Sequence, residues 1–427
     1  MTARRGTVAA AAVSAALLGG AAPALAAPSV PLAVEGQQCE VGKTRYVADS
    51  SSALSSLSVP QSWSLATGKG VTVAVVDSGV DSGNAHLGKA VLPGASFVPG
   101  APTEDLLGHG TGVAGIIAAR YVRGSALIGV APEARILPVR VFQDEDSTGT
   151  QPVAFPPDTR RMAAGISWAV RHGADVINVS MSTRPTDAAL PQLKAALDLA
   201  HRKDVVVVAS GGNQDQDAAF TQVRYPAGGR GVIGVAASSG VGEVDNWSIH
   251  GPQNDVSAPG SNVLIAFHAN GDCIAGQDHA YTSWATGFVS GLAAQLRERF
   301  PQESADQIAY RIMASADRPR LSERDDVQGW GEIRPYSALT MSIDPNRPGP
   351  PLPGAATRPK QAAVESPVTP LAARSDPLAP AREQALWWGL GAVGLCALAL
   401  VVRPWLGGVR LGRRTSRGRR RSSTGPA

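Results

Sequence analysis

Three polar motifs in this 427-residue chain contain residue types that together could hydrolyse an amide. Asp77 follows the apolar run 71–76, His109 lies in the sequence Gly-His-Gly-Thr-Gly, and Ser283 follows Thr282. A serine hydroxyl is too weakly acidic to attack an amide unless a neighbouring base takes its proton. A histidine can be that base, and a buried aspartate can hold the imidazole in the required tautomer. The three residues are therefore candidates for nucleophilic catalysis.

Each motif also has an ordinary structural interpretation. An aspartate at the end of a strand is often a turn residue, and a serine at the start of a helix is often an N-cap. The presence of all three motifs in one chain, in the order Asp77, His109, Ser283, favours catalysis over these alternatives.

The elements that must position these residues alternate along the chain. Apolar runs rich in β-branched residues predict strands buried on both faces. The expected strands are 71–76, 136–141, 176–179, 205–209 and 232–236, and the expected helices are 110–119, 162–172, 188–202 and 286–300. This alternation predicts an α/β fold with a parallel sheet between two layers of helices. In such sheets active residues collect beyond the carboxyl ends of the strands, as Asp77 does after its strand.

The same motifs carry a family resemblance. VAVVDSGVD, HGTGVAG and TSWATGFVSG resemble the three signature segments of the subtilisin-like serine proteases, or subtilases. Further similar segments extend the resemblance over roughly residues 60–340. The resemblance implies a subtilisin-like three-layer fold with a mostly parallel sheet. It also implies a serine endopeptidase whose catalytic residues are Asp77, His109 and Ser283.

The resemblance implies further site residues. The side-chain amide of Asn213 and the backbone N–H of Ser283 would bind the oxyanion, although Asn213 could instead be a turn residue after two glycines. Ser180, Met181 and Ser182 would line the substrate cleft and pair with an extended peptide. No cofactor is implied. The histidines show no metal-ligand pattern and the acidic residues no EF-hand spacing, so no metal site is predicted.

A narrower resemblance is to the mycosins, the membrane-anchored subtilases of type VII secretion loci in actinobacteria. It rests on QSWSLATGKGVTVAVVDSGVD at 61–81, on GWGEIRPYSALT at 329–340, and on the order of segments along the chain. This resemblance implies an endopeptidase that cleaves exported proteins in association with a membrane secretion complex.

Three positions depart from the family pattern. Tyr281 and Ser182 stand where active members usually have glycine, and Thr286-Gly287 stands where they usually have Ala-Pro. Tyr281 adds bulk beside the nucleophile, which would narrow the substrate range or abolish turnover. Two functions therefore remain open, an active endopeptidase and a weakly active or inactive structural component that stabilises the secretion complex.

Both ends of the chain predict membrane addressing. Arg4 and Arg5, an apolar run and Ala24-Leu25-Ala26 follow the order of a secretory signal peptide, with an Ala-rich helix as the alternative. Residues 385–402 contain no charge and precede eight arginines. This pattern predicts a single transmembrane helix, a cytoplasmic tail and an extracytoplasmic protease domain, with a buried core helix as the alternative.

The predicted organisation follows from these segments. It comprises a signal peptide (1–26), an N-terminal extension (27–60), a protease domain (61–343), a Pro-rich linker (344–384), a transmembrane helix (385–402) and a basic tail (403–427). The net charge of the chain is +4, of which the signal contributes +2 and the tail +8, so residues 27–402 carry −6. An acidic body does not favour nucleic acid. The expected partners are a polypeptide substrate, a secretion complex and, through one helix, the membrane.

The cysteines leave two alternatives. Cys39 and Cys273 would face an oxidising exterior, whereas Cys396 lies in the predicted span. The first two would either form a disulfide that ties the N-terminal extension to the domain, or remain as two unpaired thiols.

Overall fold

The computed structural model describes residues 39–49, 52–143, 155–214, 222–239, 242–354 and 379–406. The predicted signal peptide, most of the Pro-rich linker and the tail from residue 407 lie outside these residues. The chain divides into two units, 1–357 and 358–427, which are described separately.

The first unit is built on a seven-stranded sheet with the order β2-β3-β1-β4-β5-β6-β7. Its strands are β1 (Thr72–Asp77), β2 (Ala95–Ser96), β3 (Arg135–Arg140), β4 (Val176–Val179), β5 (Val206–Ser210), β6 (Val232–Ser238) and β7 (Val256–Pro259). All neighbouring strands are parallel. Every residue of β1, β4, β5, β6 and β7 is buried, which is why these strands are apolar instead of alternating.

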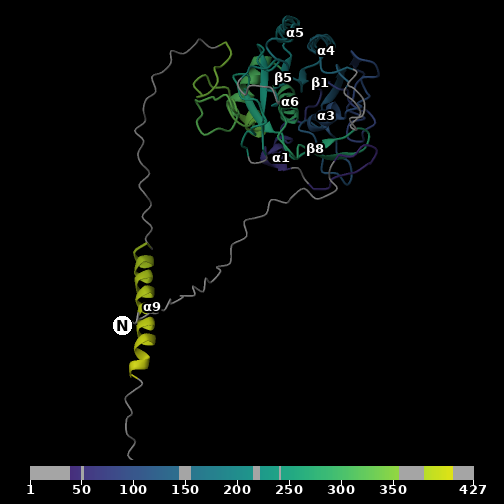
Figure 1. The fold of residues 1–427 in the computed structure, drawn as a ribbon. Helices are drawn as coiled ribbons and strands as arrows, with labels where there is room; N and C mark the ends of the chain where they lie inside the picture. The colour runs from purple at the N-terminus through teal and green to yellow at the C-terminus, as the bar shows by residue number, and fades with distance from the viewer. Residues whose placement is uncertain are drawn as a thin grey trace, which may run out of the picture. The chain divides into compact units, whose positions relative to one another are not determined.

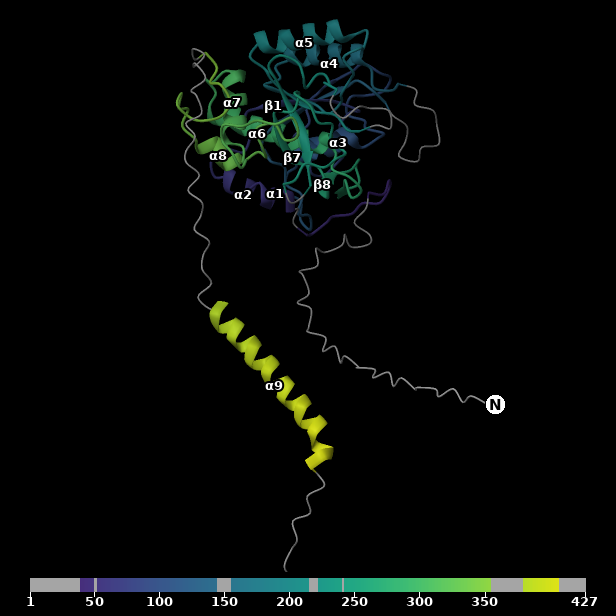
Figure 2. The same ribbon diagram turned by 60° about the vertical axis from the view of Figure 1, so that its left-hand side comes forward.

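Helices cover both faces of the sheet, as Figures 1 and 2 show. The helices of this unit are α1 (Ser52–Ser56), α2 (Val59–Ser62), α3 (His109–Ala118), α4 (Thr159–Arg171), α5 (Leu190–Arg202), α6 (Thr282–Arg299), α7 (Ala305–Ser315) and α8 (Pro335–Thr340). Val73 and Val75 of β1 belong to the core that includes α3 and α6, whereas Ala74 and Val76 pack with α4 and α5. The predicted α/β three-layer fold is confirmed.

The predicted strands and helices are all present, with ends that differ by a few residues. The largest difference is at α6, which begins at Thr282 and not at residue 286, so that Ser283 lies in its first turn. The strands β2 and β7 and the antiparallel hairpin of β8 (Val263–Ala266) and β9 (Asp272–Ala275) were not predicted. β2 has two residues, and β7, β8 and β9 have four each.

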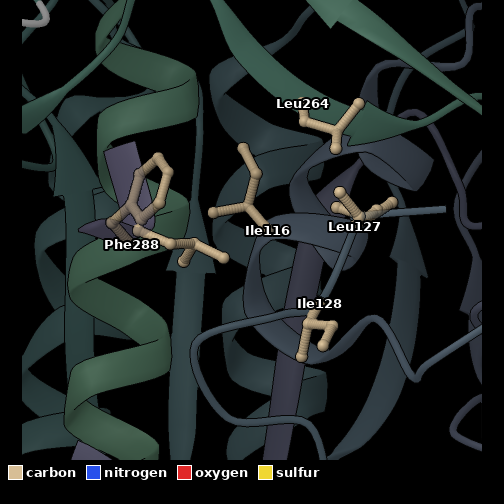
Figure 3. A pocket seen from close by; sticks show the side chains of 7 residues that line it. Ile116, Leu127, Ile128, Leu264 and Phe288 are labelled. Atoms are coloured by element: carbon tan, nitrogen blue, oxygen red, sulfur yellow. The ribbon is translucent and has the colours of Figure 1, made fainter. Parts of the chain in front are cut away.

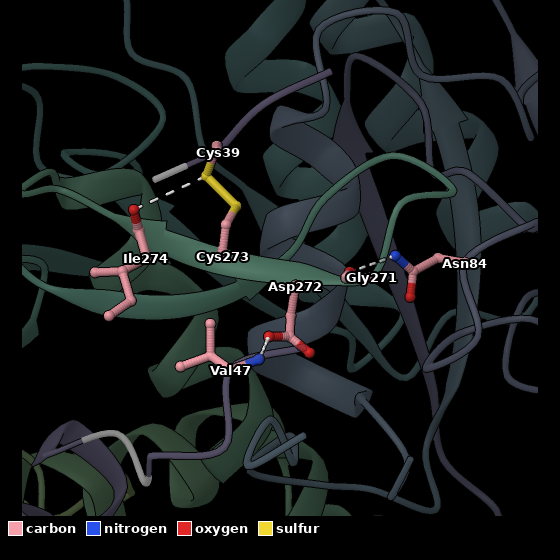
Figure 4. The surroundings of a disulfide bond; sticks show 7 residues. All are labelled: Cys39, Val47, Asn84, Gly271, Asp272, Cys273 and Ile274. Atoms are coloured by element: carbon pink, nitrogen blue, oxygen red, sulfur yellow. Dashed lines mark hydrogen bonds between the residues drawn. A yellow bond between two sulfur atoms is a disulfide. The ribbon is translucent and has the colours of Figure 1, made fainter. Parts of the chain in front are cut away.

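A disulfide holds the segment before the domain against the β8–β9 hairpin. Cys39 and Cys273 are bonded (Figure 4), so the bridge is present and the alternative of two unpaired thiols is excluded. Asp272 donates its backbone N–H to the carbonyl of Arg45 at 3.0 Å, and its Oδ1 accepts the N–H of Val47 at 2.6 Å. Residues 39–47 therefore lie along β9.

The second unit contains the helix α9 (Ala379–Leu406), which includes the predicted span 385–402. The side chains of this helix are described from 384 to 400 only, so the last two residues of the predicted span lie outside them. Within the described part of the chain, we find no helix with both the length and the apolar character that crossing a membrane requires. The prediction of a helix is confirmed, and the prediction that it spans a membrane is not supported.

Candidate active site

Asp77 and His109 meet where β1 ends and α3 begins. Asp77 is the last residue of β1, and His109 is the first residue of α3. The Oδ1 atom of Asp77 lies 2.7 Å from Nδ1 of His109 and accepts the N–H of Ser78 at 2.8 Å. The Asp77 side chain is fully buried, whereas that of His109 is 22% exposed. Because the carboxylate holds a proton on Nδ1, Nε2 is the ring nitrogen left to exchange a proton.

The surroundings of His109 raise its pKa. Burial of the imidazole lowers the pKa, but the charge of Asp77, the hydrogen bond to Asp77 and the charge of Asp105 together outweigh that effect. The pKa of His109 therefore lies above its ordinary value, so the site stabilises the imidazolium that a general base becomes.

Ser283 lies in the first turn of α6 and is only 6% exposed. The ring of the next residue, Trp284, packs on His109 with 4.9 Å between ring centroids, so the first turns of α3 and α6 are neighbours. The carbonyl of Ser283 accepts a hydrogen bond from Ser180 Oγ at 3.3 Å. No hydrogen bond among the described residues joins Ser283 Oγ to His109, and catalytic hydrogen bonds commonly tighten only when substrate binds.

The orientation of the Asn213 amide is fixed by the start of α6. Its Oδ1 accepts both the backbone N–H and the hydroxyl of Thr282, each at 2.9 Å. The residue before the helix, Tyr281, makes no side-chain cap, so Asn213 satisfies a backbone donor that would otherwise be orphaned. With the amide oxygen engaged in this way, the Nδ2 group is the donor left beside the turn that carries Ser283.

Of the three residues predicted to line the cleft, only Ser182 is exposed. Ser180 is buried and its hydroxyl accepts the side-chain N–H of Asn178 at 2.9 Å, while Met181 packs in the core with α4 and α5. This segment therefore offers a substrate its backbone and the Ser182 side chain. Its pairing with substrate stays a prediction.

Tyr281 belongs to an aromatic cluster at the start of α6. Its hydroxyl donates to Asp278 at 2.7 Å, and its ring lies 6.4 Å from the rings of both Trp247 and His279, which stack on each other at 4.4 Å. Burial and the hydrogen bond and charge of Asp278 raise the pKa of Tyr281 to about 12, so the hydroxyl remains protonated. The departure from glycine thus adds an uncharged aromatic group two residues before Ser283.

The Thr286-Gly287 departure is accommodated within α6. The Thr286 hydroxyl donates to the Thr282 carbonyl at 2.6 Å. A Cβ on Gly287 would come within 3.0 Å of the side chain of Ile116 in α3. Without a proline, α6 therefore continues as a regular helix that packs closely on α3.

Asp105 is a buried residue at this site that the sequence did not reveal. It is 4% exposed and accepts hydrogen bonds from Ser78, Gly108 and Thr111. Burial raises the pKa of Asp105 despite these hydrogen bonds. An acidic residue four positions before His109 does not by itself predict a buried carboxylate at the site. The neighbouring Glu104 is equally acidic, yet its side chain is 62% exposed.

The small cavity between α3, α6 and β8 does not offer a second ligand site. The apolar cavity in Figure 3, between Ile116, Leu127, Leu264 and Phe288, has a volume of about 10 Å³, which is too small for a ligand. Within the described ranges, no group of histidine, cysteine or acidic side chains is arranged to hold a metal ion.

Comparison with known proteins decides the family. Residues 68–331, more than half of the chain, match the subtilase family, Peptidase S8. The chain belongs to the subtilase family. This membership implies a serine endopeptidase. The prediction of a subtilase from the three motifs is therefore confirmed.

This subtilase is similar to mycosins over most of its length. It is 35% identical to Mycosin-1 of Mycobacterium tuberculosis over 331 residues, which cover 68% of this chain and 73% of that protein. The crystal structure of MycP1 from Mycobacterium smegmatis matches with a TM-score of 0.63 and 29% identity, covering 75% of this chain and 94% of that one. The periplasmic assembly from the ESX-5 inner membrane complex contains a chain that matches with a TM-score of 0.62 and 28% identity, covering 76% and 92%. The predicted resemblance to mycosins is confirmed.

Proposed function

We propose that this subtilase is a serine endopeptidase that cleaves exported proteins outside the cytoplasm, beside a type VII secretion complex. Its catalytic residues are Asp77, His109 and Ser283. The observation that carries this proposal is the 2.7 Å contact between the buried Asp77 carboxylate and Nδ1 of His109. That contact lies beside the first turn of α6, where Ser283 stands.

In the first step, Nε2 of His109 takes the proton of Ser283 Oγ as that oxygen forms a bond to the scissile carbonyl carbon. The electron pair of the carbonyl π bond moves to its oxygen, and this oxyanion is bound by Nδ2 of Asn213 and the N–H of Ser283. Asp77 keeps the Nδ1 proton in place and stabilises the imidazolium. The α6 dipole also favours negative charge at this end of the helix.

In the second step, the tetrahedral intermediate collapses, the C–N bond breaks, and His109 gives its proton to the leaving amine. A water molecule then attacks the carbonyl carbon of the acyl-Ser283 ester while His109 accepts a proton from that water. The bond between this carbon and Ser283 Oγ breaks, His109 returns the proton to Oγ, and the carboxylic product leaves. The reaction therefore consumes one water for each peptide bond.

The proposed location rests on the chain ends and on the relatives. The predicted signal peptide at 1–26 would export the domain, and the Cys39–Cys273 disulfide suits an oxidising compartment. A related chain lies in the periplasmic assembly of the ESX-5 inner membrane complex. We infer that this chain also associates with such a complex. Fractionation of a chain truncated before residue 385 tests whether α9 is needed to retain it at the membrane.

The test of the enzymatic proposal is peptide hydrolysis. The purified protein is incubated with a peptide library, and new termini are identified by mass spectrometry, with Ser283→Ala as the control. We expect cleavage by the wild-type protein and none by the variant. Cleavage that persists in Ser283→Ala would assign the activity to another residue or to a contaminant.

A structural role is the second candidate function. It is favoured by Tyr281 and Ser182, which replace glycines that would let a peptide approach closely. Export of proteins is measured in cells that carry Ser283→Ala and in cells that lack the whole chain. Normal export with Ser283→Ala and none after deletion would favour the structural role over proteolysis.

A further inference from the structure

The loop after β1 and the first turn of α3 are tied together through one buried residue, Asp105. Ser78 donates its hydroxyl to Oδ1 of Asp105 at 2.8 Å and accepts the backbone N–H of Gly110 at 3.0 Å. The two segments are already in close contact, because a Cβ on Gly110 would come within 2.1 Å of the Gly79 carbonyl oxygen. A small shift of either segment would therefore break one of these contacts.

Both carboxylate oxygens of Asp105 are used in this way. Oδ1 also accepts the N–H of Gly108 at 2.9 Å, and Oδ2 accepts the N–H of Thr111 at 2.8 Å and its hydroxyl at 2.6 Å. The backbone carbonyl of Asp105 lies 2.8 Å from Nδ1 of the buried His268, which follows β8. Asp105 thus connects three separate parts of the chain around His109.

Fewer hydrogen bonds hold the Asp77 carboxylate than hold the Asp105 carboxylate. Within the described ranges its Oδ2 has no hydrogen-bond partner, and its Oδ1 is bound only by Ser78 N–H and by His109. Ser78 is therefore the link between the two carboxylates, because its N–H binds Asp77 and its hydroxyl binds Asp105. The orientation of the Asp77–His109 pair depends on where Asp105 places Ser78 and the start of α3.

We propose that Asp105 is a positioning residue, whose buried carboxylate sets the geometry of the Asp77–His109 pair through Ser78 and the first turn of α3. Its catalytic consequence rests on the proposed function, whereas its effect on His109 does not. The charged and titratable groups around His109 are Asp77 from β1, Asp105 from the loop before α3, and His268 from the hairpin, which contacts Asp105. Because the charge of Asp105 contributes to the raised pKa of His109, its removal should lower that pKa.

The variant that tests this is Asp105→Asn. An amide has about the same shape, but its NH₂ group would face one of the N–H donors that the carboxylate now accepts, so at least one contact is lost. We expect kcat to fall by up to about 100-fold with little change in KM, as a small misplacement of catalytic groups can cause. We also expect the acid limb of the pH profile to move to lower pH.

Two further variants keep the result interpretable. Asp255→Asn is the matched control, because an oxygen of Asp255 also accepts a backbone N–H, from Gly234 at 2.9 Å. Asp255 precedes β7, and its hydrogen bonds among the described residues join it to Gly234 and Trp330, not to Asp77, His109 or Ser283. It should leave kcat and the pH profile unchanged. Ser78→Ala removes only the linking hydroxyl. It should lower kcat, and its effect combined with Asp105→Asn should be smaller than the product of the two.

The titration of His109, followed by NMR in the full chain, separates this proposal from the proposed function. Suppose that neither the wild-type protein nor any variant cleaves peptides. If the titration midpoint of His109 is still lower in Asp105→Asn, and unchanged in Asp255→Asn, the effect of Asp105 on His109 holds although the proposed proteolysis fails. The proposal is overturned if the midpoint does not move and kcat is also unchanged. If Asp105→Asn does not fold, unchanged kcat in a folded Ser78→Ala variant overturns it.

Discussion

Asn213 caps α6 in this structure and is the proposed oxyanion donor, and substitutions can separate these two roles. Its Oδ1 accepts two hydrogen bonds from Thr282 and so caps α6, and its Nδ2 is the proposed oxyanion donor. Asn213→Ala removes both groups. Asn213→Asp keeps an oxygen for Thr282 but removes the donor and places a negative charge beside the developing oxyanion.

The expected magnitudes follow from these contacts. Thr282 is fully buried, so its orphaned N–H in Asn213→Ala should cost about 1–3 kcal/mol of unfolding free energy. For a domain of this size each kcal/mol lowers Tm by roughly 2–4 °C. Loss of one oxyanion donor lowers kcat about 10²–10³-fold, or about 3–4 kcal/mol in the transition state. Asn213→Asp should therefore be nearly as stable as wild type but at least as inactive as Asn213→Ala.

The assays are thermal unfolding followed by circular dichroism and steady-state hydrolysis of a peptide that the wild-type protein cleaves. Equal Tm values for Asn213→Ala and wild type would contradict the capping role. A kcat for Asn213→Asp within a few-fold of wild type would contradict the oxyanion role, because the carboxylate cannot donate. Each half of the reasoning can thus fail independently.

Three further predictions follow from the structure. The raised pKa of His109 places the acid limb of kcat/KM above the ordinary histidine value of 6.5, since the neutral imidazole is the base and activity is lost as pH falls through that pKa; a midpoint below 6.5 would contradict this. Burial raises the pKa of Asp255 to about 6, so the protonated carboxyl is favoured in the folded protein. Ionisation of Asp255 should therefore lower the unfolding free energy by at most about 3 kcal/mol as pH rises from about 4 to above 6. Urea titrations of Asp255→Asn should lack that part of the pH dependence. Replacing Cys39 and Cys273 together with serine should lower the unfolding free energy by about 2–4 kcal/mol, because the bridge closes a loop across 234 positions; an unchanged Tm in thermal unfolding would show that the bridge does not constrain the unfolded chain.

The sequence predicted the parts of the fold that depend on local patterns. The strand β1 is six buried residues ending in Asp77, and an unbroken apolar run is what such a strand requires. The start of α6 was placed late because its cap is not local. The Asn213 side chain that satisfies the Thr282 N–H is 69 positions away in the sequence, so no local pattern could show it.

The site was predictable where a residue type itself carries the chemistry. Asp77, His109 and Ser283 were found because amide hydrolysis needs these groups, and the structure brings the first two into contact. Asp105 and Glu104 are adjacent and chemically alike, and only the fold decides that Asp105 is buried. The burial of Ser180 and Met181 likewise depends on how β4 packs between the helix layers.

The central claim is that Ser283 is an activated nucleophile, and a fluorophosphonate probe tests it most directly. The purified protein is incubated with the probe at several pH values, and the modified residue is identified by peptide mapping, with Ser283→Ala as the control. The account predicts a single adduct on Ser283, absent from the variant, that forms faster as pH rises through the titration of His109. A folded wild-type protein that is never labelled at Ser283 would contradict it.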